Sequence, residues 1–160
     1  MPPLRFKTRP GLDLIIHILF VETFPYAATL VLLNLTWQKF DWILLVVGAG
    51  ASFMAQIEQQ IRDAPIDSLH EQTFTTKIGT ENAVILLKAG AIFTMGFGFY
   101  HLLVGNIPWI VAPLGLLAVP AVALRLFRKP NQGRPETLIR IIVYLSFGYI
   151  AFLFLYAIFA

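Results

Sequence analysis

Residues Trp42 to Asp67 read WILLVVGAGASFMAQIEQQIRDAPID, an apolar run that turns polar before it reaches two aspartates. The apolar part is long enough for a transmembrane helix, which needs roughly 20 apolar residues. Its polar end places ionisable side chains at or near membrane depth, where they are costly and therefore mark candidate functional sites. Asp63 and Asp67, four residues apart, offer the oxygen ligands that a hard divalent cation prefers, and such a cation can hold a diphosphate.

Apolar runs of similar length fill most of the chain. Of its 160 residues, 58% are hydrophobic and 13% are charged, whereas a soluble domain is usually about half apolar and a quarter charged. We therefore predict an all-α fold: a polytopic membrane helical bundle with five transmembrane helices in a single membrane domain, residues 1–160. The predicted spans are Leu12–Leu35, Trp42–Ile61, Ala83–Val104, Ile107–Leu124 and Leu138–Phe159.

The distribution of basic residues predicts the orientation, because Lys and Arg concentrate on the cytoplasmic side of membrane proteins. The segment before the first span and the loops after the second and fourth spans contain nine basic residues: Arg5, Lys7, Arg9, Arg62, Lys77, Arg125, Arg128, Lys129 and Arg134. The opposite side has Lys39 alone. We expect an integral, multi-pass membrane protein whose amino terminus and loops 62–82 and 125–137 are cytoplasmic. Loop 62–82 is long and polar enough to form a structured cap.

The composition argues against cysteine-based chemistry and against nucleic-acid binding. The chain has no cysteine, which excludes disulfides and thiol chemistry. Its net charge is only +3, and no basic stripe with interleaved aromatic residues indicates a nucleic-acid partner.

A polar stripe leads along the second span toward the aspartates. Ser52, Gln56, Gln60 and Asp63 recur at helical spacing and share one face, with Gln59 beside them. One interpretation is hydrogen bonding between helices. The other is the lining of a cavity, which the continuity of the stripe with Asp63 favours.

Two prolines are expected to interrupt the first two spans. Pro65 disfavours helical geometry at the preceding residue, so we expect the second helix to end near Asp63. Asp67 would then lie on a turn or on a fresh short helix. Pro25 should kink the first span, which also contains Asp13 and His17 four residues apart. Asp13 is expected to pair with His17; alternatively, His17 lines the same cavity as the aspartates, together with Glu22.

Small residues mark a packing face on the third span. Gly90, Thr94 and Gly98 follow one another at four-residue steps, which lets another helix approach closely.

Two segments resemble a known family. Pro2-Pro3-Leu4-Arg5-Phe6-Lys7 followed by Arg9-Pro10-Gly11-Leu12-Asp13 resembles the entry to the fifth helix of UbiA-superfamily membrane prenyltransferases. The superfamily's second aspartate-rich motif resembles the segment Gln60-Ile61-Arg62-Asp63 through Asp67. The loop after that motif resembles Thr73-Phe74-Thr75-Thr76-Lys77-Ile78-Gly79. The order of the spans corresponds to helices five to nine of the nine-helix UbiA fold. The resemblance covers nearly the whole chain.

The resemblance implies a set of site residues. Asp63 and Asp67 match the positions that hold Mg²⁺ bridging a prenyl diphosphate, and they are the implied catalytic and metal-binding residues. The implied substrate-binding residues are Arg62, Lys77, Gln59 and Gln56. The implied reaction is ionisation of an allylic prenyl diphosphate, followed by transfer of the prenyl group to a lipid or aromatic acceptor within the membrane.

The departures from the family pattern shape the functional prediction. The chain has no equivalent of the superfamily's first aspartate-rich motif, so half of the metal site is missing. Leu69, His70 and Glu71 replace the usual glycine and basic residue, and Pro65 between the aspartates is unusual. We therefore expect a prenyltransferase half that is active only with a second membrane polypeptide or larger complex.

Other interpretations of the same residues stay open. The chain is alternatively a non-catalytic UbiA-like accessory subunit of a larger membrane complex, including a pigment-containing one. Glu58, four residues before Arg62, favours an ordinary ion pair within the helix. Lys77 is alternatively a marker of the cytoplasmic interface. A small transporter with a polar pore from Ser52 to Asp63 is the least favoured interpretation, because no inverted repeat is visible.

Overall fold

The computed structural model describes residues 10–70, 72–128 and 135–159. Every regular element within these ranges is a helix. Five stretches are long and apolar enough to cross a membrane: Leu12–Leu32, Lys39–Leu69, Thr80–Leu103, Trp109–Phe127 and Glu136–Phe159. The predicted all-helical fold with five membrane-length helices is confirmed. Parts of the orientation and motif predictions lie outside the described ranges, namely Arg5, Lys7, Arg9, Glu71, Lys129, Arg134 and the side chains of Glu22 and His70.

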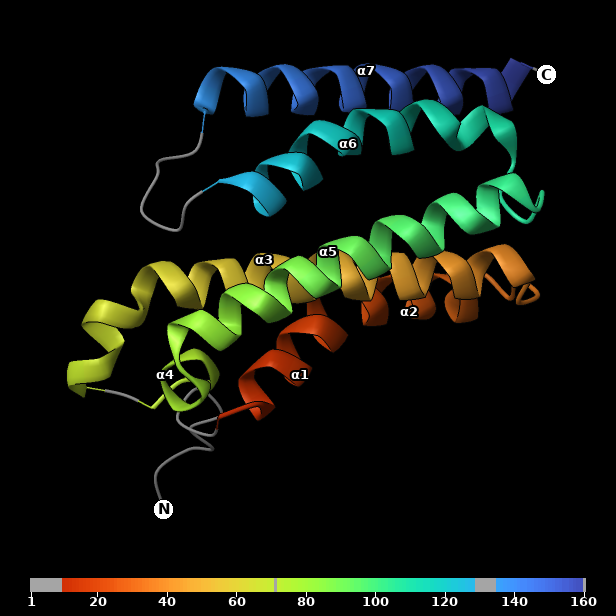
Figure 1. The fold of residues 1–160 in the computed structure, drawn as a ribbon. Coiled ribbons are helices and arrows are strands. Elements are labelled where there is room, and N and C mark those ends of the chain that lie inside the picture. The colour runs from red at the N-terminus through yellow and green to blue at the C-terminus, as the bar shows by residue number, and fades with distance from the viewer. Residues whose placement is uncertain (1–9, 71, 129–134, 160) are drawn as a thin grey trace. The chain divides into compact units, whose positions relative to one another are not determined.

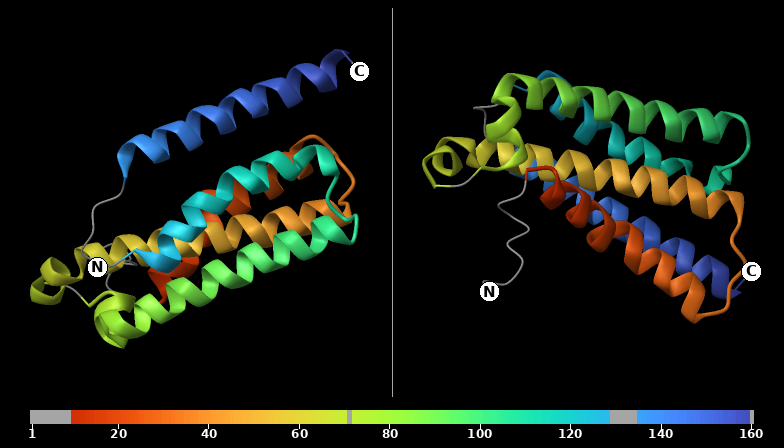
Figure 2. Two further views of the ribbon diagram at one scale, coloured as in Figure 1. Left: turned by 45° about the horizontal axis from the view of Figure 1, so that its top comes forward. Right: turned by 90° about the horizontal axis from the view of Figure 1, so that it is seen from below.

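The chain forms two compact units, Met1–Gly98 and Phe99–Ala160. The first contains α1 (Leu12–Ile18), the π-helical turn η2 (Leu19–Thr23), α2 (Phe24–Leu32), α3 (Lys39–His70), α4 (Phe74–Ile78) and most of α5 (Thr80–Leu103). Within this unit, α3 lies between α5 on one side and α1 with α2 on the other (Figure 2). The long helix α3 is thus the core element to which the other helices attach.

The first span is distorted where Pro25 enters it, as predicted. Pro25 stands in the first turn of α2, directly after the π-helical turn η2. Proline has no backbone N–H and crowds the carbonyl four residues earlier, so the preceding turn widens. The Thr23 hydroxyl donates hydrogen bonds to the carbonyls of Ile18 and Leu19, at 3.1 and 2.8 Å. This side chain therefore satisfies backbone groups that the widened turn leaves poorly paired.

The predicted end of the second helix near Asp63 is wrong. Helix α3 has 32 residues and continues through Pro65 as far as His70. The end of α3 bends away from the axis of the rest of the helix (Figure 1). A bend relieves the clash between a proline ring and the carbonyl one turn earlier, which allows the helix to continue. Asp67 consequently lies on the same helix as Asp63, and part of the predicted 62–82 loop is helical.

The small-residue face of α5 packs against α3, as predicted. A Cβ atom built on Gly50 of α3 would lie 2.2 Å from Thr94 Oγ1, which shows that the two backbones approach closely there. Gly90 faces Phe53 in the same way, with a built Cβ 3.2 Å from the ring. Small residues therefore set the separation between α3 and α5.

The second unit contains the end of α5, the short helix η3 (Trp109–Val111), α6 (Ala112–Phe127) and α7 (Glu136–Phe159). Helices α6 and α7 contact each other, and the Tyr149 hydroxyl donates a 2.6 Å hydrogen bond to the carbonyl of Ile110. No residue of α6 or α7 is fully buried. Surfaces this apolar require lipid or another protein around them.

Candidate functional site

The two aspartates of the candidate site lie one turn apart on a single face of α3. Asp63 is exposed and Asp67 is half-buried. Neither carboxylate makes a hydrogen bond or an ion pair with another residue of the described ranges. Both carboxylates are therefore available to a ligand.

The predicted substrate-binding residues lie on two helices and differ in exposure. Arg62 and Gln59 are exposed on α3, and Lys77 is exposed on α4, which packs against α3. Gln56 is half-buried. The proposed ion pair between Glu58 and Arg62 does not form: Arg62 has no ion pair with a described residue, whereas Glu58 is buried.

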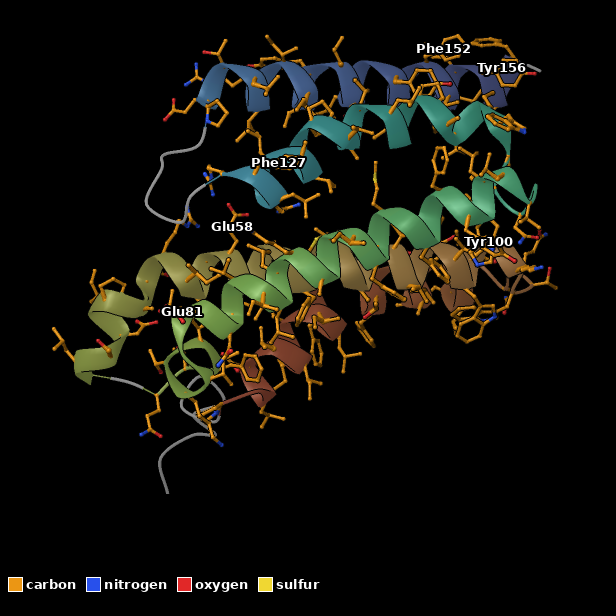
Figure 3. All side chains as sticks on the ribbon, viewed as in Figure 1. Glu58, Glu81, Tyr100, Phe127, Phe152 and Tyr156 are labelled. Atoms are coloured by element: carbon orange, nitrogen blue, oxygen red, sulfur yellow. The ribbon has the colours of Figure 1, made fainter. Side chains whose placement is uncertain are left out.

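Glu58 is a residue that the sequence interpretation undervalued. It is 5% exposed and lies on the side of α3 away from α1 (Figure 3). A buried carboxylate within an apolar span is a functional candidate by default. The sequence shows this acidic residue within an apolar span, but an ion pair with Arg62 one turn away was the simpler interpretation of Glu58.

Gln60 links three helices through a buried hydrogen-bond node. Its side chain is 4% exposed, and its Nε2 donates to Asp13 Oδ2 of α1. Its Oε1 accepts a hydrogen bond from the backbone N–H of Thr75 in α4, at 3.1 Å. The other Asp13 oxygen, Oδ1, accepts from the N–H of Gly11 at 3.0 Å. Hydrogen bonding between helices therefore accounts for Gln60, and the favoured cavity-lining role is wrong for it.

The node also overturns the predicted pairing of Asp13 with His17. Both Asp13 oxygens are used by Gly11 and Gln60, and His17 makes no hydrogen bond to another described residue. A partner on a neighbouring helix has replaced the partner one turn away.

The polar stripe on α3 is covered along only part of its length. Ser52 is buried, and its hydroxyl has no hydrogen-bond partner in the described part of the chain. Gln60 is buried within the node, whereas Asp63 at the end of the stripe is exposed. Ser52 and Gln56 remain candidates for lining a cavity, because their side-chain polar groups are not used elsewhere among the described residues.

A second node stabilises the opposite end of α3. The Tyr26 hydroxyl of α2 donates to Asp41 Oδ1 at 2.6 Å, and the backbone N–H of Gln38 donates to Asp41 Oδ2 at 2.6 Å. A first-turn carboxylate that reaches back to the N–H before the helix is the reciprocal half of a capping box. Asp41 is therefore committed to structure, in contrast to Asp63 and Asp67.

The donor set at the end of α3 is incomplete for a free metal ion. No group of three or more His, Cys, Asp or Glu side chains that could hold a metal occurs among the described residues. Mg²⁺ commonly binds one or two carboxylates and takes its remaining ligands from water and substrate phosphates. Asp63 and Asp67 fit such a magnesium–diphosphate complex, because the diphosphate oxygens supply ligands that the chain lacks.

The candidate site is thus a pair of uncommitted carboxylates at the polar end of α3, with cationic side chains on α3 and α4. Oxygen ligands and positive charges together suit an anion that carries a divalent cation. In comparisons with protein-family models, with curated proteins and with solved structures, nothing matches this chain.

Proposed function

We propose that this chain is half of a UbiA-like membrane prenyltransferase, which binds a magnesium-bound prenyl diphosphate and transfers the prenyl group only with a complementary chain. The observation that carries the proposal is the pair Asp63 and Asp67, which share one face of an unbroken helix and have no protein partner among the described residues. The resemblance of the surrounding motif to the second aspartate-rich motif supplies the reaction class.

The proposal assigns roles to the polar residues around the pair. Asp63 and Asp67 would hold the magnesium ion, which neutralises charge on the diphosphate when it is bound. Arg62 and Lys77 supply positive charge that favours the anion and the charge developing on the departing oxygen. Gln59 and Gln56 remain candidates for contacts to substrate. The acceptor would be a lipid or an aromatic compound that reaches the site from the membrane.

The proposal predicts that the chain binds magnesium and diphosphate only in combination. Titration calorimetry of the purified chain should detect weak binding of magnesium pyrophosphate and negligible binding of Mg²⁺ alone, because two carboxylates do not complete the ion's coordination. Asp63→Asn with Asp67→Asn should weaken this binding at least about tenfold, which corresponds to roughly 1.4 kcal/mol.

Glu136→Gln is the matched control for this titration. It removes an exposed carboxylate from the first turn of α7, in the other unit, and should leave the affinity unchanged. Equal affinity of the double variant and the unmodified chain would refute the proposal. With a complementary chain that carries the first aspartate motif, prenyl transfer should appear, and Asp63→Ala should abolish it.

A second candidate function is that of a non-catalytic subunit in a larger membrane complex. The observation that favours it is the exposure of α6 and α7, neither of which contains a fully buried residue. Lipid alone is sufficient to cover such helices, so this observation is less specific than the aspartate pair. Failure of magnesium pyrophosphate to bind would make this second function the preferred one.

The proposal includes a cytoplasmic location for the amino terminus and for loops 62–82 and 125–137. Because the chain lacks cysteine, each single-cysteine variant contains one reactive thiol. Gln72→Cys should react with a membrane-impermeant maleimide in inside-out vesicles, and Thr36→Cys should react in right-side-out vesicles. Both positions are exposed and lie between helices. The reverse labelling pattern would contradict the orientation.

A further inference from the structure

The end of α3 carries an exposed apolar stripe beside the aspartates. Ile66 is 69% exposed and Leu69 is 76% exposed, and Arg62 is exposed one turn before Ile66. These three residues, here called the Arg62–Leu69 stripe, follow one another at four- and three-residue steps and therefore share a face. Asp63 and Asp67 occupy a face about 100° further round the helix. The end of α3 is thus amphipathic.

The length of α3 places this stripe at a membrane boundary. At about 1.5 Å per residue, a helix of 32 residues is about 48 Å long, whereas the hydrocarbon core is about 30 Å thick. Tilts of up to about 40° do not absorb the difference. Trp42 stacks on Trp37 with ring centroids 4.8 Å apart, and tryptophan concentrates at membrane interfaces. A span of roughly 20 residues from Trp42 reaches the opposite interface close to Arg62.

The bend in α3 begins where the stripe lies. Pro65 is inside the helix, and the end of α3 departs from the main axis (Figure 1). A straight continuation would carry Ile66 and Leu69 away from the membrane into water. A bent continuation can run along the membrane surface, which is where amphipathic helices with apolar and basic residues bind.

We propose that the end of α3 lies in the boundary between lipid headgroups and acyl chains. Ile66 and Leu69 insert into the acyl region, and the long Arg62 side chain keeps its guanidinium at the headgroup level, as basic side chains do near helix ends. Asp63 and Asp67 then face the headgroup and water layer. The occupant of the stripe is the lipid surface, because the stripe continues directly from a membrane span and combines apolar side chains with one cation. The proposal does not depend on what the aspartates bind.

Spin labels on single cysteines test this placement in the full chain. Ile66→Cys, Leu69→Cys and Ser68→Cys are labelled, and each variant is reconstituted alone into phosphatidylcholine vesicles. Collision with oxygen, which partitions into the bilayer, is compared with collision with a polar nickel complex. The ratio of oxygen to nickel accessibility should be several-fold higher at positions 66 and 69 than at position 68, the exposed control on another face.

Two results would overturn the proposal. A nickel-dominated signal at positions 66 and 69 would place the stripe in water. Exclusion of both reagents from these positions would show that a second copy of the chain covers the stripe. All three substituted side chains are exposed, so the labels should not disturb packing, and circular dichroism verifies that helix content is unchanged.

Discussion

Gln60→Leu is expected to destabilise the first unit by about 2 kcal/mol, because it removes the two hydrogen bonds that the Gln60 side chain makes in the buried node. The substitution leaves the buried N–H of Thr75 without its acceptor and takes one donor from the Asp13 carboxylate. An unsatisfied buried polar group costs about 1–3 kcal/mol, and hydrogen bonds between membrane helices contribute about 0.6–2 kcal/mol. Denaturant titration of the purified chain, followed by tryptophan fluorescence, measures the change in the free energy of unfolding.

The neighbouring glutamine provides the control for this prediction. Gln59→Leu makes the same chemical change at an exposed position that has no hydrogen bond to another described residue, and it should change stability by less than about 0.5 kcal/mol. Equal stability of Gln60→Leu and Gln59→Leu would show that the node contributes nothing.

A charged variant at the same position separates the effects of the two hydrogen bonds that the Gln60 side chain makes. Gln60→Glu keeps an acceptor for Thr75 but places a second carboxylate against Asp13. Two carboxylates at one site repel each other until one of them binds a proton. The variant should therefore be destabilised at neutral pH and should recover as the pH falls, since a protonated carboxyl can again donate to its neighbour. The absence of any recovery on acidification would contradict the assigned contact with Asp13.

Gly50→Ala is expected to destabilise the packing of α3 against α5 by about 1–3 kcal/mol, the usual cost of overpacking a core. The added Cβ would lie 2.2 Å from Thr94 Oγ1, 3.0 Å from Thr94 Cγ2 and 3.2 Å from Thr94 Cβ. Because Cβ is fixed to the backbone, a rotation of the threonine side chain cannot relieve every contact, and the helices must separate. Gly96→Ala on α5 is the control, because its Cβ would meet nothing within 4 Å.

A second substitution in α5 tests whether Thr94 is the residue that excludes a side chain at Gly50. Thr94 Oγ1 is buried without a hydrogen-bond partner in the described ranges, so Thr94→Ala should itself cost little. In the double variant the closest remaining contact is the Cβ atom at 3.2 Å, and much of the lost stability should return. If the stability losses of Gly50→Ala and Thr94→Ala simply add in the double variant, an atom outside the Thr94 side chain causes the clash with the new Cβ.

Local patterns in the sequence predicted some features of α3 correctly and misjudged others. The apolar run that begins at Trp42 predicted that α3 is a membrane-length helix. The small residues of the third span predicted the face of α5 that packs against α3. The rule that proline ends helices failed at Pro65, because it describes a local preference that a bend can satisfy. Helical spacing correctly placed Gln60 and Asp63 on the same side of α3. It contained no information on where neighbouring helices stop covering that side, so burial at Gln60 and exposure at Asp63 were not predicted.

Side-chain partners were the least predictable part of the candidate site. Asp13 was expected to pair with His17 one turn away, but it instead contacts Gln60, 47 residues along the chain. A hydrogen bond between two helices depends on their relative rotation and depth, which no periodicity within either helix encodes.

Hydropathy was sufficient to predict an all-helical chain with five membrane-length helices, because bilayer thickness and helix geometry act on each segment independently. The placement of Asp63 and Asp67 on one helix came only from the structure, in which α3 continues through Pro65. The folded arrangement established which carboxylates are used in holding helices together. Asp13 and Asp41 are committed to other helices or to a helix start, whereas Asp63 and Asp67 have no hydrogen bond or ion pair within the described chain. That distinction arises from contacts between segments far apart in sequence, and only packing brings those segments together.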